Sequence, residues 1–200
     1  MAWDFKSELR RKAVHLLALG FIAVFVLVSV NYGKQLALLA LVLLLIVFLE
    51  LEYVRLELQK TIPVFWRLWR GKERHRFGGE VFFLIGSIIS LAVFDFDIAL
   101  AAILMTIFGD MAAALIGRKF GRVWLAENRA LEGILAELGV NFVIAFFVFG
   151  YHGDNWVLMC VMPITATTVE TVIEKMDDNL IIPLFSGFNG QIARFLLAVF

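Results

Sequence analysis

Cysteine is almost absent from this 200-residue chain, in which Cys160 is the single thiol. A lone cysteine excludes an internal disulfide and any metal site built on cysteine ligands. Charged residues are also scarce, at 18%, and the formal net charge is zero. The sequence contains no internal repeat, low-complexity tract or separate soluble domain, and nothing in it indicates a nucleic-acid partner.

Apolar residues are what the chain has in abundance. They make up 62% of it, against roughly 45 to 50% in an ordinary soluble domain, and the mean hydropathy is +0.88. Most of the surface must therefore face lipid. The composition predicts an all-α polytopic membrane protein, with residues 1–200 forming one integral membrane domain in the cell membrane of a prokaryote.

Seven apolar runs predict membrane-spanning helices, although several are shorter than the roughly 20 residues that cross a bilayer comfortably. The first run follows Arg10, Arg11 and Lys12 without a convincing cleavage site, so we expect a retained anchor rather than a signal peptide. The predicted spans are 15–31, 35–53, 78–94, 97–116, 133–150, 155–169 and 180–200.

The distribution of basic residues predicts the orientation. With the N-terminus inside, every Lys and Arg except Lys34 and Arg194 falls in a cytoplasmic segment, as the positive-inside rule requires. We therefore expect the N-terminus inside, the C-terminus outside and the chemistry at the cytoplasmic face. Arg194, near the outer end of the last span, is expected to snorkel or to pair with a buried acid.

The cytoplasmic connection 54–77 alternates apolar residues such as Phe65 and Trp69 with cations such as Arg67 and Arg70. This pattern predicts an amphipathic helix in the membrane surface, with its aromatic side chains among the lipid headgroups. Two roles stay open for it, a topogenic anchor or a direct contact with a substrate headgroup or nucleotide.

Asp110 lies inside an apolar run, where a carboxylate costs roughly 2.5 to 3.5 kcal/mol at mid-membrane depth, so we expect a cationic partner and a function. Beside it Gly109, Ala113 and Gly117 recur every four residues and predict a face that another helix approaches closely. The alternative for Asp110 is a purely structural ion pair.

The helix is expected to lead into a cytoplasmic basic loop, 117–132, whose glycines and cations suit a polyphosphate. It is not a P-loop, because the required glycine and Lys-Ser/Thr spacing is missing. A merely topogenic loop would have the same composition. The residues concerned are Gly117, Arg118, Lys119, Gly121, Arg122 and Arg129.

Further acids follow. Glu132 stands at a helix start, where capping is the default role, and Glu137 lies deeper in the same span and needs a partner. If the sixth helix is continuous, it places Glu170, Glu174 and Asp177 or Asp178 on one face. Such a cluster suits Mg²⁺ held together with substrate phosphates, and a solvated helix end is the alternative.

The N-terminal segment offers a last group, in which Glu8, Lys12 and His15 share one helical face. They are predicted either to hold a phosphate or to orient a carboxylate. Topogenic charge beside an interfacial histidine explains them equally well.

Taken in order, four segments resemble the family of dolichol kinases, phytol kinases and CTP-dependent diacylglycerol kinases. The resemblance implies transfer of the γ-phosphate of CTP to a membrane lipid alcohol, of the polyprenol, phytol/geranylgeraniol or diacylglycerol class, with Mg²⁺ or another divalent cation. One departure is that Arg129-Ala130 stands where Lys followed by Ser or Thr is expected, so a hydroxyl is missing. The segments are 8–15, 109–121, 131–133 and 177–183.

On this hypothesis the acids bind the metal and the cations neutralise the triphosphate. The expected catalytic residues are Asp110, Glu132 and Asp178. The expected metal ligands are Asp110, Glu170, Glu174, Asp177 and Asp178. The expected nucleotide contacts are Gly117, Arg118, Lys119, Gly121, Arg122, Arg129, Gly133 and Asn179. Alternatives are a cytidylyltransferase that makes a CDP-lipid and a small transporter.

Overall fold

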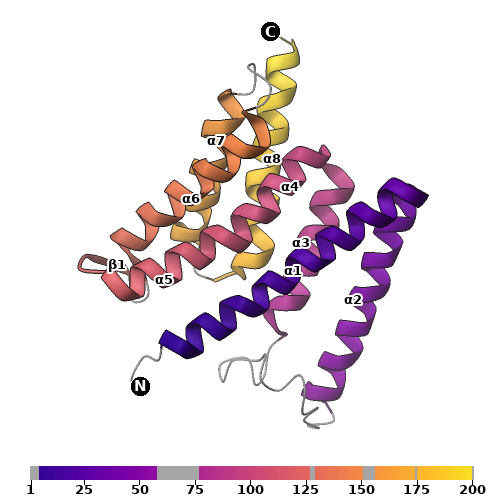
Figure 1. Ribbon diagram of the computed structural model, residues 1–200, viewed down its shortest axis with the longest axis horizontal. Coiled ribbons are helices and arrows are strands. Elements are labelled where there is room, and N and C mark those ends of the chain that lie inside the picture. The colour runs from indigo at the N-terminus through magenta and orange to yellow at the C-terminus, as the bar shows by residue number, and fades with distance from the viewer. Residues whose placement is uncertain (1–4, 58–76, 127–128, 151–155, 174, 200) are drawn as a thin grey trace. The chain divides into compact units, whose positions relative to one another are not determined.

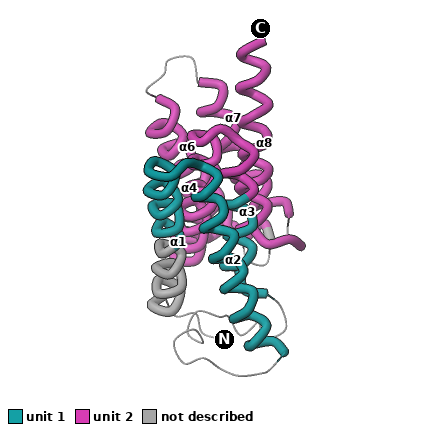
Figure 2. The backbone as a smooth tube through the Cα atoms, turned by 90° about the vertical axis from the view of Figure 1, so that its right-hand side faces the viewer, with its two compact units in different colours: residues 1–88 teal, residues 89–200 magenta. Residues whose placement is uncertain are grey.

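The computed structural model describes residues 5–57, 77–126, 129–150, 156–173 and 175–199, apart from the side chains of 5–17 and 126. The chain forms two compact units, Met1–Ile88 and Ile89–Phe200, which Figure 2 draws in separate colours. The predicted interfacial helix in 54–77 lies almost entirely outside the described residues, and the side chains of Glu8, Lys12 and His15 also lie outside them.

Unit 1 is built on a helical hairpin of α1 (Phe5–Tyr32) and α2 (Lys34–Leu56). The turn between them is Gly33, whose φ of 92° is open to glycine but costly for other residues. The rings of Phe21 and Phe48 meet edge to face with centroids 6.1 Å apart and join the two helices. Near the end of α2, Glu52 is buried and accepts hydrogen bonds from the Arg55 guanidinium and from the backbone N–H of Gly78.

Unit 2 contains the remaining helices, which Figure 1 shows as a bundle in magenta to yellow. Helix α6 packs against both α5 and α7, and α8 packs against α7 and α4. These helices follow α3 (Gly79–Val93), which crosses the boundary between the units. They are α4 (Phe96–Leu104), the π-helix η2 (Met105–Gly109), α5 (Asp110–Phe120), α6 (Leu131–Phe149), α7 (Trp156–Val172) and α8 (Asp178–Val199).

Between α5 and α6 lies a short antiparallel ribbon of β1 (Trp124–Ala126) and β2 (Arg129–Ala130). Its end is closed by a 2.8 Å hydrogen bond from the Leu131 N–H to the Val123 carbonyl. The predicted basic loop therefore starts later than expected, because α5 continues to Phe120. Gly117, Arg118 and Lys119 lie on the helix and not in the loop.

The small-residue face of the α4–α5 span meets α6, as the sequence predicted. A β-carbon on Gly133 would lie 2.7 Å from the Ala113 carbonyl oxygen and 2.9 Å from the Gly117 Cα. A β-carbon on Gly109 would lie 2.6 Å from Oδ1 of Asn141. The two backbones therefore approach closely only because glycines face each other across the crossing.

Four described helices are long and apolar enough to cross a membrane, namely α2, the continuous Phe96–Phe120 helix, α6 and α8. Three shorter apolar helices accompany them. Their outward surfaces carry large apolar side chains such as Leu43, Phe147 and Phe195, as lipid contact requires. The predicted all-α membrane fold is confirmed, and the seven expected runs correspond to helices within a few residues at each described end, except that α1 begins at Phe5, well before residue 15.

The condition set for the acidic cluster does not hold. A shared face for Glu170 and Asp178 required one continuous sixth helix, but α7 ends at Val172 and α8 begins at Asp178. Asp177 ends the connection, where its Oδ1 accepts a 3.0 Å hydrogen bond from the Asn179 N–H and its carbonyl accepts from Leu180 and Ile181. This local bonding starts a new helix in place of extending the old one.

Candidate active site

The centre of the candidate site is Arg129, which the β1–β2 ribbon holds just before α6. Its Nη1 donates to Oε1 of Glu170 at 2.8 Å, and its Nη2 donates to Oδ2 of Asp178 at 3.4 Å. One guanidinium thus joins the end of α7 to the start of α8. The break between these helices does not separate the two acids, because Arg129 bridges them.

The charge of Arg129 is maintained by its acidic surroundings. Burial by itself would lower the pKa of this guanidinium, but the carboxylates of Glu170 and Asp178 raise the pKa above its usual value. Arg129 therefore remains a cation inside the protein and is suited to partner an anion.

Next to Arg129 lies a layer of buried polar side chains from α6 and α7. Nδ2 of Asn141 donates to Oγ1 of Thr167 at 3.1 Å and to Oε1 of Glu137 at 3.5 Å. Glu137, Asn141, Thr167 and Glu170 are each at most 5% exposed. Within the described part of the chain, Oε2 of Glu137, Oδ1 of Asn141 and Oε2 of Glu170 have no hydrogen-bond partner.

Asp110 adds a third helix to this group. The charge of Asp110 acts on both Glu137 and Glu170, and that of Asp178 acts on Glu170 as well. Asp110 directly follows the π-helix η2, a feature often found at functional sites. Asp110 and Asp178 therefore both lie within electrostatic range of Glu170. Carboxylates that interact in this way repel one another unless a proton or a cation lies among them.

The basic residues line a cavity at the end of α5. It has a volume of about 450 Å³ and is lined by Lys119, Phe120, Gly121, Arg122 and Glu132. Oε1 of Glu132 accepts a 3.0 Å hydrogen bond from the backbone N–H of Arg122. Glu132, expected among the catalytic residues, thus contacts the basic connection, and no described contact joins it to Glu170.

Comparison with known proteins indicates what such a site does. A CTP-dependent diacylglycerol kinase of Saccharomyces cerevisiae is 30% identical over 153 residues, which cover 73% of this chain and 52% of the yeast protein. Another, from Schizosaccharomyces pombe, is 26% identical over 92% of this chain and 93% of its own length. The chain is related to the CTP-dependent diacylglycerol kinases. The resemblance expected from the sequence is confirmed.

This chain spans about half the length of the Saccharomyces kinase. An uncharacterized protein of Rickettsia prowazekii, 27% identical, matches it over 97% of the chain and 98% of its own length. No family model matches the sequence, and no solved structure matches it.

The structure places the expected site residues in several separate locations. Hydrogen bonds join Arg129 to Glu170 and Asp178, and the charges of Asp110 and Glu137 act on Glu170. Asp177 and Asn179 form the start of α8, while Gly133 serves the helix crossing. Glu174 lies outside the described residues. Among the described residues, no three Asp, Glu, His or Cys side chains already form a cation-binding group.

Two buried polar residues of the site were missed from the sequence, Asn141 and Thr167. The signal for Asn141 was available: an amide inside an apolar run, one helical turn after Glu137, shares that acid's face. Thr167 gives no comparable signal, because a threonine in an apolar helix normally bonds to its own backbone.

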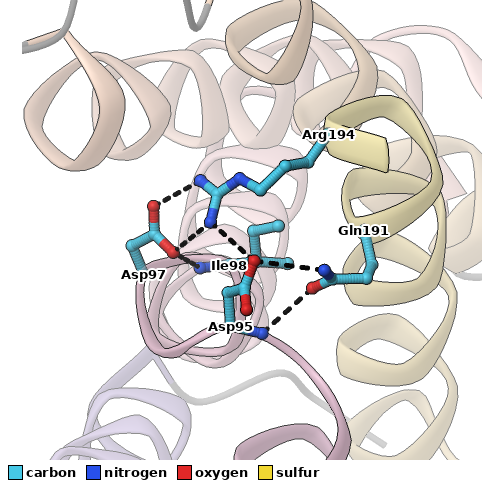
Figure 3. Close-up of polar contacts among 5 residues, drawn as sticks. All are labelled: Asp95, Asp97, Ile98, Gln191 and Arg194. Carbon is cyan, nitrogen blue, oxygen red and sulfur yellow. Dashed lines mark hydrogen bonds and ion pairs between the residues drawn. The ribbon is translucent and has the colours of Figure 1, made fainter. Parts of the chain in front are cut away.

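The other end of unit 2 carries a second charged cluster, shown in Figure 3. Nη1 of Arg194 donates to Oδ2 of Asp95 at 3.0 Å and to Oδ1 of Asp97 at 2.7 Å, and Nη2 donates to the other oxygen of Asp97. Gln191 exchanges hydrogen bonds with the side chain and backbone of Asp95. Arg194 pairs with acids as predicted, but those acids are substantially exposed rather than buried.

Proposed function

We propose that this protein is a CTP-dependent lipid kinase. It transfers the terminal phosphoryl group of CTP to the hydroxyl oxygen of diacylglycerol or a related lipid alcohol. The bond between the γ-phosphorus and the β–γ bridging oxygen breaks, a new phosphorus–oxygen bond forms, and the hydroxyl loses its proton. The products are CDP and a lipid phosphate. The names of the similar proteins support this reaction, with diacylglycerol as the first acceptor to test.

The observation that carries the proposal is that carboxylates of α5, α6 and α8 act on the buried Glu170 of α7, which is bonded to Arg129. Enzymatic phosphoryl transfer depends mainly on alignment and on neutralising charge around the transferred group. The site has acids for a metal on one side. The end of α5 and the connection after it provide the cations Arg118, Lys119 and Arg122.

We propose Mg²⁺ as the metal, held by one or two of the carboxylates of Asp110, Glu170 and Asp178 together with phosphate oxygens of the nucleotide. The residues fit this role, because Oε2 of Glu170 is buried and lacks a hydrogen-bond partner among the described residues. Mg²⁺ is commonly held by one or two carboxylates together with substrate phosphates, so the protein need not supply every ligand. When bound, the metal would neutralise charge on the triphosphate.

The chain's own cations have separate roles in this proposal. Arg118, Lys119 and Arg122 bind the triphosphate, and their guanidinium and ammonium groups stabilise the charge that moves toward CDP. Arg129 keeps Glu170 and Asp178 together and faces the transferred group. The lipid alcohol reaches the site sideways from the bilayer, with its tail against the apolar helices.

We further propose that the site faces the cytoplasm. The distribution of Lys and Arg supports this orientation, because the α5–α6 connection belongs to the basic set of segments. It also agrees with the supply of the donor, since CTP is a soluble cytoplasmic nucleotide while the acceptor lies in the membrane.

The test is a transfer assay with purified protein in lipid nanodiscs, Mg²⁺ and γ-labelled CTP. Diacylglycerol, a polyprenol, phytol and geranylgeraniol are offered separately. We expect label in the lipid fraction with at least one alcohol, and loss of transfer when the divalent metal is chelated. No labelled lipid with any of them would overturn the proposal, and a CDP-lipid product from α-labelled CTP would identify a cytidylyltransferase instead.

Asp110→Asn tests the site separately from the reaction. We expect this variant to insert normally and to lose measurable turnover, because Asp110 is a proposed metal ligand. Asp97→Asn is the matched control, since it removes a carboxylate near the opposite end of the same continuous helix. Near-normal turnover by Asp110→Asn would remove this residue from the site.

A further inference from the structure

The β1–β2 ribbon leaves large apolar side chains uncovered at the end of α5, where Figure 1 shows it. Val123 is 50% exposed, Trp124 50% and Leu125 61%. Trp124 and Leu125 are successive residues of β1, so they point to opposite faces of the ribbon and both faces carry an exposed apolar side chain. Contiguous apolar side chains of this kind mark a surface that contacts a membrane or another protein.

Exposed apolar side chains also flank the ribbon on both sides along the chain. Ile116 and Phe120 are exposed on α5, and Leu131 and Leu135, one turn apart, are exposed on α6. The Leu131 N–H bonds to the Val123 carbonyl, which joins the ribbon to the start of α6. Since these helices belong to a bundle that contacts lipid, the ribbon continues a lipid-facing surface.

The depth of the ribbon follows from the helix that leads to it. Phe96–Phe120 is continuous over 25 residues, about 37 Å at 1.5 Å per residue, whereas the hydrocarbon core is about 30 Å thick and the whole bilayer about 40 to 45 Å. The exposed cluster of Arg194, Asp95 and Asp97 lies at the start of this helix, and charged groups are costly in hydrocarbon. The other end of the helix, and the ribbon after it, therefore reach the headgroups of the opposite leaflet.

We propose that the β1–β2 ribbon is seated in the headgroup layer of the membrane, with Val123, Trp124 and Leu125 against the upper parts of the acyl chains. Tryptophan is favoured at this boundary. The ribbon has only two strands, so its outer edges need water, and this excludes a deeper position in the hydrocarbon. The occupant of the apolar surface is thus the lipid of the same membrane.

A seated ribbon also fixes the depth of the candidate active site. Trp124 pairs with Ala130, the residue after Arg129, and Arg129 bonds to Glu170 and Asp178. This consequence rests on the proposed function, because the hydroxyl of a lipid alcohol lies at headgroup depth. The ribbon therefore holds Arg129 at the level where the acceptor presents its hydroxyl.

The test of depth makes use of the single cysteine. In a Cys160→Ser background, Leu125→Cys carries a fluorophore, and the protein is placed in nanodiscs that contain spin-labelled lipids. We expect lipids labelled near the headgroup to quench the fluorophore at least about threefold more than lipids labelled near the chain end, and aqueous iodide to quench it poorly. The fluorophore on Cys160 of the wild-type chain, which is exposed on the apolar helix α7, is the reference for a lipid-facing position.

Full quenching by iodide without any effect of the spin-labelled lipids would overturn the proposal. Protection from both quenchers would overturn it equally, because protein would then cover the ribbon. Neither result depends on catalysis, so the proposed kinase reaction would still stand. A seated ribbon in a protein that phosphorylates no lipid would instead retain the membrane contact and reject the kinase.

A second measurement compares Leu125→Asp with Leu125→Phe in the transfer assay. We expect Leu125→Asp to raise the apparent KM for the lipid alcohol about threefold to tenfold, because a carboxylate disfavours the apolar boundary. The KM for CTP should stay unchanged, and Leu125→Phe, which keeps an apolar side chain, should behave like wild type. An equal rise in both variants, or a rise in the KM for CTP alone, would overturn the role of the ribbon in setting the depth of the site.

Discussion

The two ends of unit 2 use the same components and arrive at opposite results. At each end one arginine pairs with two acids from other parts of the chain, Arg129 with Glu170 and Asp178 and Arg194 with Asp95 and Asp97. Asp178 and Arg194 are 16 residues apart in α8, which corresponds to about 24 Å along the helix.

The two arginine clusters differ in the burial and the hydrogen bonding of their acids. Around Arg194 the acids are substantially exposed, and Gln191 satisfies Asp95 further, so the cluster is complete as it stands. Around Arg129 the main acid is buried, two more acids act on it, and buried oxygens of Glu137, Asn141 and Glu170 have no partner among the described residues. A cluster whose charges are all paired holds helices together, whereas a cluster with unpartnered buried oxygens is suited to bind a cation or a substrate.

The largest effect that distinguishes the two ends is expected from Glu170→Gln. The substitution removes a buried charge but keeps the shape, so we expect folding and insertion to persist while phosphoryl transfer falls about 100-fold or more. The measurement is kcat in the labelled-CTP assay, together with a thermal melt of the same sample. Transfer within tenfold of wild type would mean that the Arg129 end is a structural clamp like the Arg194 end.

An intermediate effect is expected from Gly133→Ala at the crossing of α5 and α6. The new methyl group meets backbone atoms at 2.7 and 2.9 Å, so the helices must separate. We expect the free energy of unfolding to fall by about 1 to 3 kcal/mol, and transfer to fall because Asp110 and Glu137 move apart.

The matched control for this change is Gly139→Ala, six residues further along α6, where a β-carbon meets nothing within 4 Å. We expect the control to be neutral or slightly stabilising, since alanine favours helix more than glycine does. Equal melting temperatures for both variants would show that the close crossing does not hold the site together.

The smallest effect is expected from Arg194→Ala. Partly exposed ion pairs contribute little because water screens them, so we expect a loss of about 1 kcal/mol in the free energy of unfolding and no change in kcat/KM for CTP. Denaturation in mild detergent and the transfer assay measure the two quantities. A drop in kcat/KM without loss of stability would show that the two ends are coupled.

Much of the fold could be predicted because it depends on short-range patterns. Apolar runs located the helices, and the four-residue repeat of Gly109, Ala113 and Gly117 correctly predicted a close helix crossing. Whether one helix continues from Glu170 to Asp178 stayed open, since the spacing of these two acids also suits a continuous helix. Only the local bonding of Asp177 distinguishes the two possibilities.

The sequence indicated which acids and cations belong to the candidate site, but it did not indicate how they pair. The acids and cations were identified, but the pairing of Arg129 with Glu170 joins residues 41 positions apart, and no local pattern specifies such a contact. Arg129 was expected to touch nucleotide, and its position between two acids depends on how the β1–β2 ribbon places it. The separate location of Glu132 depends on the same ribbon.

The π-helical turn η2 changes which side of the Phe96–Phe120 helix each later residue faces. An extra residue in one turn shifts everything after it by about 100° around the axis. The segment before the turn and the segment after it therefore present different sides to their neighbours, although the chain runs through both without a break. A helical wheel drawn with one uniform angle from Phe96 to Phe120 would assign Asp110 to the wrong side.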